Sequence, residues 1–478
     1  MADTAVSEQA LAARVAEWAS STSFEALPED VVESTKLRIL DVLGLALAGL
    51  GTPLGRSVRR ATRVMSPDGP SRVWGSGDHV AVGAAAFANA AFAQALEYDD
   101  THNESIVHMS SPAVAMALAL AETRTVSGRD LIVAIALANE IACRVGSVAP
   151  GQFHRRGFHP TGLFAPFGIA IGAGRLLGLT SEEMTWAAGT VGSLAAGLLE
   201  CWVDGTQTKF LHSGFAAQNG IHAAMLAQAG ATGPPRVLEG RFGLFASHLQ
   251  DASVTRAFGR VVDELDARWE SRNASFKPFP AAHVLHPYID LILRLREQHG
   301  IRPDDVQSID CPVAEFNVSI VCEPVEEKVA PATEAHGRVC LQFTLAEALV
   351  RGELGRSAYS EEARHDPEIL AVARRVTYHV DPAFPPPGQF KGAVQVTLKD
   401  GRVFDEVEEF NRGSVQNPMT VDELRAKFHD NASGALPADQ RTHLVDAVAR
   451  TEVVPDARVL VDLAVGGSLS HRAVARER

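Results

Sequence analysis

The feature that most constrains the fold is a series of segments before about residue 260 that have helical spacing and are apolar nearly all round. A helix without a polar face cannot lie on the surface of a domain, so these segments are expected to pack against one another at its centre. Their small residues, as in GAAAFANAAFAQA, let helix backbones approach closely. The pattern predicts helices over residues 28–50, 82–96, 112–122, 130–145, 164–177, 181–199 and 210–229.

The pattern changes after about Arg302. VQSIDCPV, RRVTYHVD and GAVQVTLKDGRVFDEVEEF alternate β-branched residues as strands do, and the last contains the hairpin signal Lys399-Asp400-Gly401. Further helices are predicted at 287–298, 345–351, 360–374 and 420–450. The predicted fold is therefore mainly α, with a large all-helical domain at 1–270 and 410–478 and a smaller α+β domain at 271–409.

Composition excludes several classes of function. Asp and Glu outnumber Lys and Arg by 58 to 44, which does not suit a partner that is a nucleic acid or an anionic membrane. The five cysteines form no C-x-x-C pair, so neither a zinc ribbon nor an iron–sulfur cluster is indicated. Widely spaced thiols, an N-terminus without a basic n-region and no apolar run of about 18 residues predict a cytoplasmic, soluble protein.

An acidic loop follows the predicted helix at 82–96. The sequence Glu97-Tyr98-Asp99-Asp100-Thr101-His102 leads through Glu104 to His108, Ser110 and Ser111. Carboxylates this crowded repel one another unless some meet cations, backbone donors or protons, and such loops often carry function. Helix capping by Asp99 or Asp100 and by Ser110 or Ser111 is an equally good interpretation.

Lysine is scarce, with seven in the chain, and two lysines lie in apolar settings beside histidines. Lys209 precedes an Ala-rich helix in GTQTKFLHSG, and Lys277 lies in FKPFP shortly before His283 and His286. Burying an unpaired ammonium is costly unless an anion meets it. An anion site is therefore favoured over two lysines that merely extend to solvent.

His159 lies in Gly157-Phe158-His159-Pro160-Thr161, where Thr161 is a candidate N-cap of the next helix. A histidine beside a helix start can bind an anionic group, although a purely structural histidine is the commoner case. The segment Asn411-Arg412-Gly413-Ser414 has the composition of an ordinary loop and is not predicted to be a site.

Several mechanisms are excluded by their missing motifs. The chain has no G-x-S-x-G elbow, no G-x-x-x-x-G-K-[ST] loop and no H-E-x-x-H pair, and no ligand spacing supports a metal strongly. The remaining lysines, histidines and carboxylates suit a cofactor-free pocket. Such a set fits proton abstraction next to a carboxylate of a small polyanion.

The sequence resembles the MmgE/PrpD family, which includes 2-methylcitrate dehydratase, cis-aconitate decarboxylase and iminodisuccinate epimerase. The similar stretches span most of the chain: ALEYDDTH, GFHPTGLFAPFGIAIGAGRLLGL, TKFLHSGFAAQNGIHAAMLAQAGATGPPRVLEGRFGLF, KPFPAAHVLHPYID and FNRGSVQNPMTVDELRAKF. The resemblance implies that the α+β domain is a lid over a helical domain. It also implies a homodimer, an active site between the domains, and no metal or organic cofactor.

The resemblance also assigns candidate site residues, with His286 as an alternative to His283. We expect Lys209 and Lys277 to hold substrate carboxylates, His159 to transfer a proton or to bind an oxyanion, and His108 and His283 to be the other acid–base residues. The candidate catalytic residues are His159, Lys209, His108, His283 and Asp99, and the candidate substrate-binding residues are Lys277, Thr101, Glu97 and Asp100.

Four departures from the family pattern bear on the reaction. Glu97 stands where the decarboxylases have Asp, the loop after Thr101 is longer, and Met109 replaces a usual Pro. The stretch 314–333, where the decarboxylases place a tyrosine, has none. The missing tyrosine weakens the decarboxylase interpretation, and the paired cationic groups together with the family resemblance lead us to expect a hydro-lyase acting on a 2-methylcitrate-like acid. Epimerisation of a dicarboxylate such as iminodisuccinate comes second and decarboxylation of cis-aconitate third. The non-enzymatic alternative is a catalytically inactive protein that binds an anion.

Overall fold

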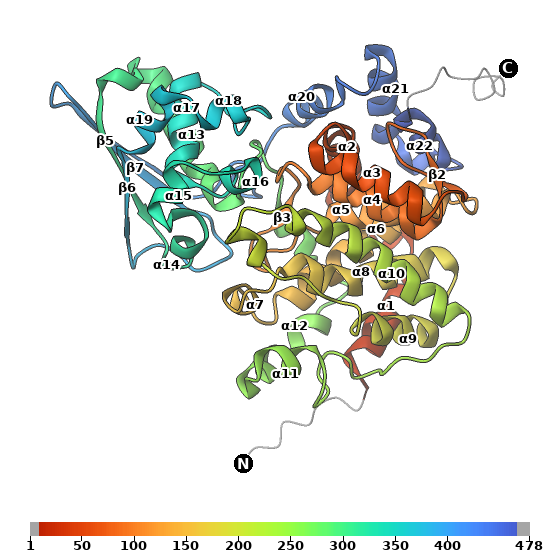
Figure 1. The fold of residues 1–478 in the computed structure, drawn as a ribbon. Helices are drawn as coiled ribbons and strands as arrows, with labels where there is room; N and C mark the ends of the chain where they lie inside the picture. Colours follow the sequence, from red (N-terminus) through yellow and green to blue (C-terminus); the bar gives the residue numbers. More distant parts are fainter. Residues whose placement is uncertain (1–8, 466–478) are drawn as a thin grey trace.

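The structure is a computed structural model, and it describes residues 9–465. It contains two hydrophobic cores, which occupy the two lobes of Figure 1. The larger core is built from residues 11–274 together with 428–464, and the smaller from residues 279–398. The predicted fold class, mainly α with a smaller α+β part, is confirmed. The exact domain limits stay a prediction.

The larger part is a packed set of helices around α8, which contacts α6, α10 and α5. Of these central helices, α5, α6 and α8 are buried nearly all round, as their sequences predict, whereas α10 has one exposed side. Its helices are α1 (Leu11–Ser21), α2 (Glu29–Leu50), α3 (Pro53–Met65), α4 (Val82–Gln94), α5 (Ser110–Ala121), α6 (Gly128–Gly146), α7 (Gln152–Arg155), α8 (Pro160–Leu177), α9 (Ser181–Val191), α10 (His212–Gln228), α11 (Leu244–Leu249), α12 (Gly259–Val262), α20 (Val421–Ala432), α21 (Ala438–Ala449) and α22 (Arg458–Ala464).

The smaller part is a four-stranded sheet with helices packed against it. The strand order is β6 (Val376–Val380), β5 (Val306–Val313), β7 (Gly392–Leu398), β8 (Val403–Glu408); only the β5–β6 pair is parallel. The predicted hairpin joins β7 to β8. Helices α13 and α17 contact the sheet, and α19 packs on α17. The helices of this part are α13 (His286–His299), α14 (Glu315–Asn317), α15 (Val325–Val329), α16 (Glu334–Gly337), α17 (Leu341–Arg351), α18 (Glu361–Arg364) and α19 (Pro367–Ala373).

Three predicted helices are shorter or broken. The helix expected over 181–199 ends at Val191, because the chain beyond it pairs its backbone with the segment around His159. Pro367 starts a new helix inside 360–374, and Pro437 starts one inside 420–450. Proline tolerates the first turn of a helix but not its interior, so both stretches divide there.

Two short ladders join distant segments of the helical part. Strand β1 (Ser71–Arg72) pairs with β2 (His79–Val80), and β3 (Thr101–His102) pairs with β4 (Ala274–Ser275). The second ladder matters most for the site, because it holds the acidic loop beside the segment that carries Lys277.

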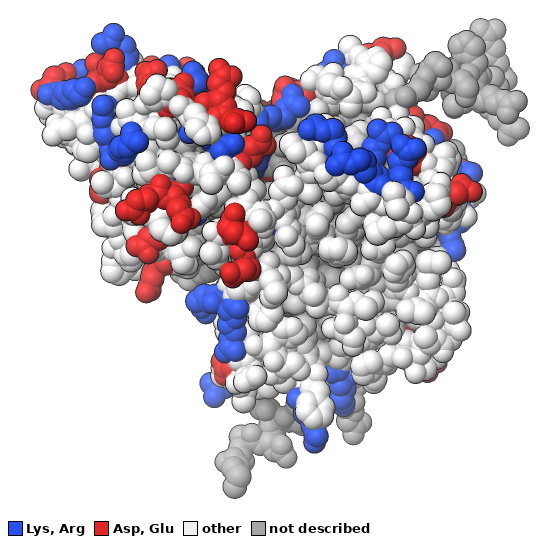
Figure 2. Space-filling model, viewed as in Figure 1, with Lys and Arg blue, Asp and Glu red and all other residues white. Residues whose placement is uncertain are grey.

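The surface in Figure 2 has a broad area around α10 without Lys, Arg, Asp or Glu, and α10 itself contains none of these residues. Among the described residues, no single helix is long and apolar enough to cross a membrane. The bent pair α2 and α3 meets that length and composition only when the two helices are taken together.

Candidate active site

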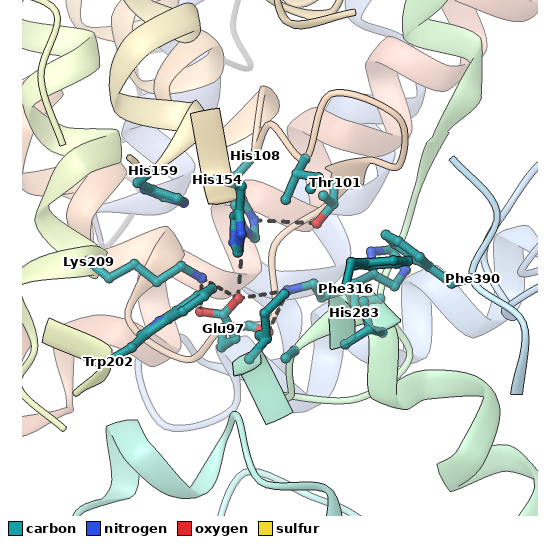
Figure 3. Close-up of a pocket in the computed structure, with 15 residues that line it drawn as sticks. Glu97, Thr101, His108, His154, His159, Trp202, Lys209, His283, Phe316 and Phe390 are labelled. Atoms are coloured by element: carbon teal, nitrogen blue, oxygen red, sulfur yellow. Dashed lines mark hydrogen bonds and ion pairs between the residues drawn. The ribbon is translucent and has the colours of Figure 1, made fainter. Parts of the chain in front are cut away.

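A cavity of about 500 Å³ lies between the helical part and the α+β part. Both parts supply its walls, and Figure 3 shows Lys209 and His159 on one side with His283 and Phe390 on the other. Seven of the nine predicted site residues line it, and Asp99 and Asp100 do not. The lining residues are Glu97, Thr101, Ile106, His108, His154, His159, Trp202, Lys209, Lys277, Ala282, His283, Val284, Phe316, Ile320 and Phe390.

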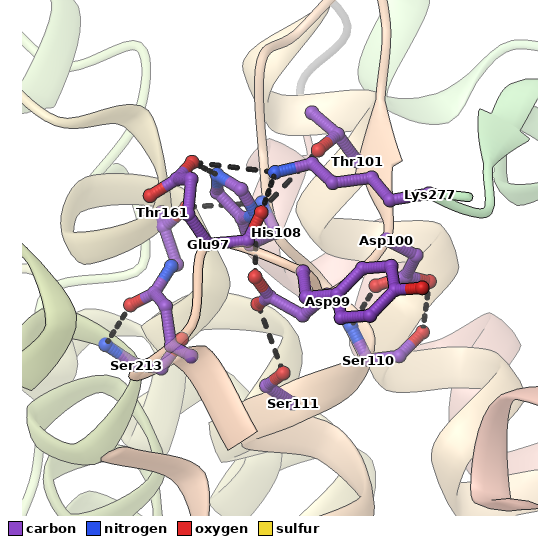
Figure 4. A network of polar contacts seen from close by, with 12 residues as sticks. Glu97, Asp99, Asp100, Thr101, His108, Ser110, Ser111, Thr161, Ser213 and Lys277 are labelled. Atoms are coloured by element: carbon purple, nitrogen blue, oxygen red, sulfur yellow. Dashed lines mark hydrogen bonds and ion pairs between the residues drawn. The ribbon is translucent and has the colours of Figure 1, made fainter. Parts of the chain in front are cut away.

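Each carboxylate of the acidic loop has a cationic or hydrogen-bonding partner, which offsets the repulsion among the carboxylates. Figure 4 shows Glu97, Asp99 and Asp100 with partners of this kind. Glu97 meets two lysines, and Asp99 meets His108 at 3.1 Å. Asp100 pairs with Arg38, and Glu104 binds Arg260 through both oxygens. The functional interpretation and the capping interpretation of this loop therefore both describe part of it.

Asp100 has a helix-capping role at the start of α5. It is buried and accepts hydrogen bonds from the backbone N–H and hydroxyl of Ser110, the first residue of α5, while pairing with Arg38 of α2. The Arg38 side chain also donates to the Ala274 carbonyl at 3.1 Å. Because Asp100 does not line the cavity, we replace its expected substrate-binding role with a structural one.

Replacing Asp100 with asparagine is expected to lower the free energy of unfolding by about 3–5 kcal/mol, because Arg38 is left buried without its counterion. Urea unfolding measures this loss. Glu104→Gln is the control, since the Glu104–Arg260 pair is about one-third exposed and its loss is expected to cost less than about 1 kcal/mol. A raised KM with unchanged stability would restore the substrate-binding role.

Glu97 contacts both cavity lysines. Its carboxylate accepts from Lys209 with both oxygens and from Lys277 at 3.3 Å, and its backbone carbonyl accepts from Lys277 at 3.0 Å. Burial alone would raise the pKa of Glu97, but the two ammonium groups hold it far below its ordinary value. The two lysines therefore meet a charged carboxylate of the protein itself.

The backbone at Glu97 is strained. Its φ is +54°, a conformation that costs roughly 1–3 kcal/mol for a residue with a Cβ and is found mostly at functional sites. Residue 97 follows α4 and turns the chain into the acidic loop. The strained turn directs the carboxylate to Lys209 (Figure 3) and to Lys277 (Figure 4).

The two lysines reach Glu97 from separate segments. Lys209 lies in the single 3₁₀ turn Thr208–Leu211 directly before α10, with Trp202 beneath its ammonium at 5.5 Å. Lys277 follows β4, whose pairing with Thr101 and His102 brings it to the loop, and it is completely buried. Burial lowers the pKa of the Lys277 ammonium, while Glu97 and Asp99 oppose that effect.

His108 is oriented by Asp99. The His108 Nδ1 lies 3.1 Å from Asp99, whose other oxygen accepts from the Ser111 hydroxyl. Burial would raise the pKa of Asp99, but the His108 ring lowers it below its ordinary value. With Nδ1 engaged, Nε2 is the nitrogen of His108 that faces Glu97, at 3.7 Å, and is available for proton transfer.

His159 lies at the start of α8 and is the residue before its first turn. Its backbone N–H donates to Gly197 at 3.0 Å, and its ring Nε2 is buried without a partner. Burial, followed by the nearby Lys209 charge, lowers its pKa well below the ordinary histidine value. The predicted N-cap Thr161 is wrong, because α8 begins at Pro160 and the Thr161 hydroxyl instead accepts from the His108 backbone N–H.

His283, rather than His286, lines the cavity. Its Nε2 lies 2.9 Å from the Asn411 amide nitrogen, while His286 binds the Ala281 carbonyl behind it. Asn411 was expected to belong to an ordinary loop. That loop approaches the site because Gly413 has φ +92° and a Cβ there would lie 2.1 Å from the Phe276 carbonyl oxygen.

Sequence reasoning also missed several cavity residues. His154 and Trp202 come from the helical part, and Phe316, Ile320 and Phe390 come from the α+β part. Burial and Lys209 lower the pKa of His154 to about 4. The local sequence of each is ordinary, so no signal marked them. Within residues 9–465, no group of three or more histidine, cysteine, aspartate or glutamate side chains is arranged to hold a metal ion.

Comparison with known proteins places the chain in a family. The MmgE/PrpD N-terminal domain matches residues 13–257, and the MmgE/PrpD C-terminal domain matches residues 279–452. The chain belongs to the MmgE/PrpD family. The resemblance found in its motifs is therefore confirmed, and the cavity lies where residues of both family domains meet.

Three members of the MmgE/PrpD family illustrate its range. Cis-aconitate decarboxylase of Aspergillus terreus is 28% identical over 94% of this chain and 95% of its own length. Human cis-aconitate decarboxylase is 28% identical over 92% of each chain. The mitochondrial 2-methylcitrate dehydratase of Yarrowia lipolytica is 24% identical over 91% of this chain and 86% of its own.

Proposed function

We propose that this protein is a lyase that transfers a proton at the carbon next to a carboxylate of a small di- or tricarboxylate. The observation that carries the proposal is the convergence of Lys209, Lys277, His108 and His159 on one enclosed cavity. Two ammonium groups neutralise carboxylates, and imidazole side chains can accept or donate a proton in general acid–base catalysis.

In this mechanism the two lysines bind one substrate carboxylate and shift Glu97 from its resting position. His159 Nε2, which has no partner in the structure, removes the proton from the adjacent carbon. The electron pair moves into an enolate-like carboxylate that the ammonium groups stabilise. His108 acts in its doubly protonated form: Asp99 accepts its Nδ1 proton, and its Nε2 proton passes to the leaving hydroxyl as the carbon–oxygen bond breaks, which releases water and leaves His108 neutral.

Dehydration of a 2-methylcitrate-like acid is our first choice, because His108, which Asp99 orients, can protonate the leaving hydroxyl. The second candidate is decarboxylation, which is the reaction in the names of relatives that match more than nine-tenths of this chain. Against it, the α+β part presents Phe316 and Ile320 to the cavity and no tyrosine. Epimerisation remains the third outcome to test.

Proton NMR of the purified protein with 2-methylcitrate, cis-aconitate and iminodisuccinate in deuterated water distinguishes these reactions. Loss of water from 2-methylcitrate is expected. Release of carbon dioxide from cis-aconitate would select the second candidate, and deuterium exchange alone would select epimerisation. Tight binding of these acids without any turnover would contradict the lyase proposal and support an anion-binding protein.

Glu97→Gln tests whether the lysine pair is the anion site. Removing the carboxylate leaves two buried cations unpaired, so the melting temperature without ligand is expected to fall. Tricarballylate, an unreactive tricarboxylate, is expected to raise the melting temperature more in Glu97→Gln than in the wild type, since it replaces the lost counterion. Glu97→Asp, which keeps the charge, is the control. Equal ligand shifts in all three proteins would contradict this site.

We also propose that the protein is a homodimer joined through the uncharged side of α10. Phe215, Met225 and Leu226 of α10 are 41%, 44% and 47% exposed. Figure 2 shows no Lys, Arg, Asp or Glu over the area around this helix. Exposed apolar patches commonly mark interfaces. Sedimentation equilibrium is expected to give twice the chain mass, and a monomer would contradict it.

The five cysteines are free and buried, which supports a location in the reducing cytoplasm.

A further inference from the structure

His159 has a second histidine behind it. The Nδ1 atoms of His159 and His212 lie 2.9 Å apart, and the two rings are 5.1 Å apart between centroids. His212 is the first residue of α10 and does not line the cavity. His159 therefore has its Nε2 at the cavity and its Nδ1 on His212.

Only one hydrogen atom fits between two facing Nδ1 atoms at this distance. Burial, with Lys209 nearby, lowers the pKa of both rings, and that of His212 falls to about 4, so the pair is uncharged near neutral pH. If His159 donates to His212, its Nε2 is a free base. If His212 donates, the His159 Nε2 carries a proton and is an acid.

His212 also lies closer to the outside of the protein than His159 does. His159 is 1% exposed and His212 is 5% exposed. Gly197 lies against both rings, where a Cβ would come within 3.2 Å of the His212 Nδ1 and 3.4 Å of the His159 Cβ. The backbone thus holds the two rings face to face without a side chain between them.

We propose that His212 is a positioning and relay residue that carries the catalytic proton between His159 and solvent. The inference rests on the proposed function, in which His159 transfers a proton at a substrate carbon. The His212 Nε2, on the side of the ring away from His159, exchanges its proton with water.

The relay balances in protons and charge. His159 Nε2 takes the substrate proton as the carbon–hydrogen bond breaks and its electron pair stays on the substrate. The proton on His159 Nδ1 then passes to His212 Nδ1, and the proton on His212 Nε2 passes to water. Both rings end neutral, each in its other tautomer. The reverse sequence delivers a solvent proton to a substrate carbanion.

The variants His212→Asn and His212→Phe separate relay from simple support. Asparagine can still hydrogen-bond to His159 Nδ1 but cannot pass a proton on, and phenylalanine can do neither. The relay predicts that His212→Asn lowers kcat by about tenfold or more with little change in KM. In mixtures of light and heavy water, the rate of the wild type is expected to depend on deuterium content along a curve, as for two protons in motion. His212→Asn is expected to give a straight line.

A role in support alone predicts that His212→Asn keeps the wild-type kcat and the curved dependence, and that result would overturn the relay. His299→Asn, on the exposed end of α13, is the control for a distant histidine. The resting protein gives a test that needs no turnover. The shared Nδ1 proton is expected as a far-downfield proton NMR signal that His212→Phe loses. If the signal is present but no acid is turned over, the proposed function is refuted and the His159–His212 hydrogen bond stands. If the signal is absent, the hydrogen-bonded His159–His212 pair is refuted, and the relay with it.

Discussion

Lys209→Met is expected to lower kcat/KM by about a thousandfold. Methionine keeps the length and apolar contacts of the side chain but removes the ammonium that binds both oxygens of Glu97. In the proposed mechanism the same ammonium holds the substrate carboxylate and stabilises the enolate, and one such donor is worth about 10²–10³ in rate. Steady-state kinetics with the acid found to react measures the effect.

Lys391→Met is the control for this variant, because Lys391 forms only a partly exposed pair with Glu409 outside the cavity. Lys209→Arg adds a finer test. Its planar guanidinium keeps the charge but is larger than the ammonium that contacts Glu97 and Trp202 and has a different hydrogen-bonding geometry, so it is expected to restore little activity. A Lys209→Met protein with more than a tenth of the wild-type activity would remove Lys209 from the reaction.

His159→Asn is expected to lower kcat by about 10²–10⁴-fold, the range for loss of a general base, while KM stays close to that of the wild type. The reason is that the two lysines bind the substrate carboxylate and His159 only moves the proton. Binding of tricarballylate, measured by calorimetry, serves as the internal control. A variant that loses binding but keeps kcat would make His159 an anion ligand instead.

The site residues that the sequence predicted best are charged residues that lie in apolar segments. Lys209 and Lys277 are charged residues in apolar segments, and they reach the same carboxylate although they lie 68 positions apart. His159, His108 and His283 were found through family resemblance together with their loop positions. All five line one cavity.

The roles within the acidic loop could not be predicted, because they depend on partners far away in the chain. Asp100 pairs with Arg38, which lies in α2, and Asp99 orients His108. The loop composition gave no means of assigning these partners. The same limit applies to Asn411 and His212, whose local sequences are those of an ordinary turn and an ordinary helix start.

The fold shows a similar division. The apolar helices at the centre were predictable, because a helix without a polar face must be buried on all sides. The end of α9 at Val191 was not predictable, since the residues after it leave the helix to pair with the backbone near Phe158. The sheet order, with β5 between β6 and β7, likewise depends on contacts that no single strand encodes.

Deuterium transfer is the most direct test of the central claim, which is that His159 exchanges a proton between solvent and a carbon beside a carboxylate. Wild type, His159→Asn and Lys209→Met are run in deuterated water in the direction that adds a proton to that carbon, which for a dehydratase is hydration of the unsaturated acid, and the deuterium at that carbon is read by NMR and mass spectrometry. The account predicts deuterium at this carbon with the wild type and almost none with either variant. Turnover by the wild type with no deuterium at the carbon in substrate or product, or equal incorporation by His159→Asn, would contradict it.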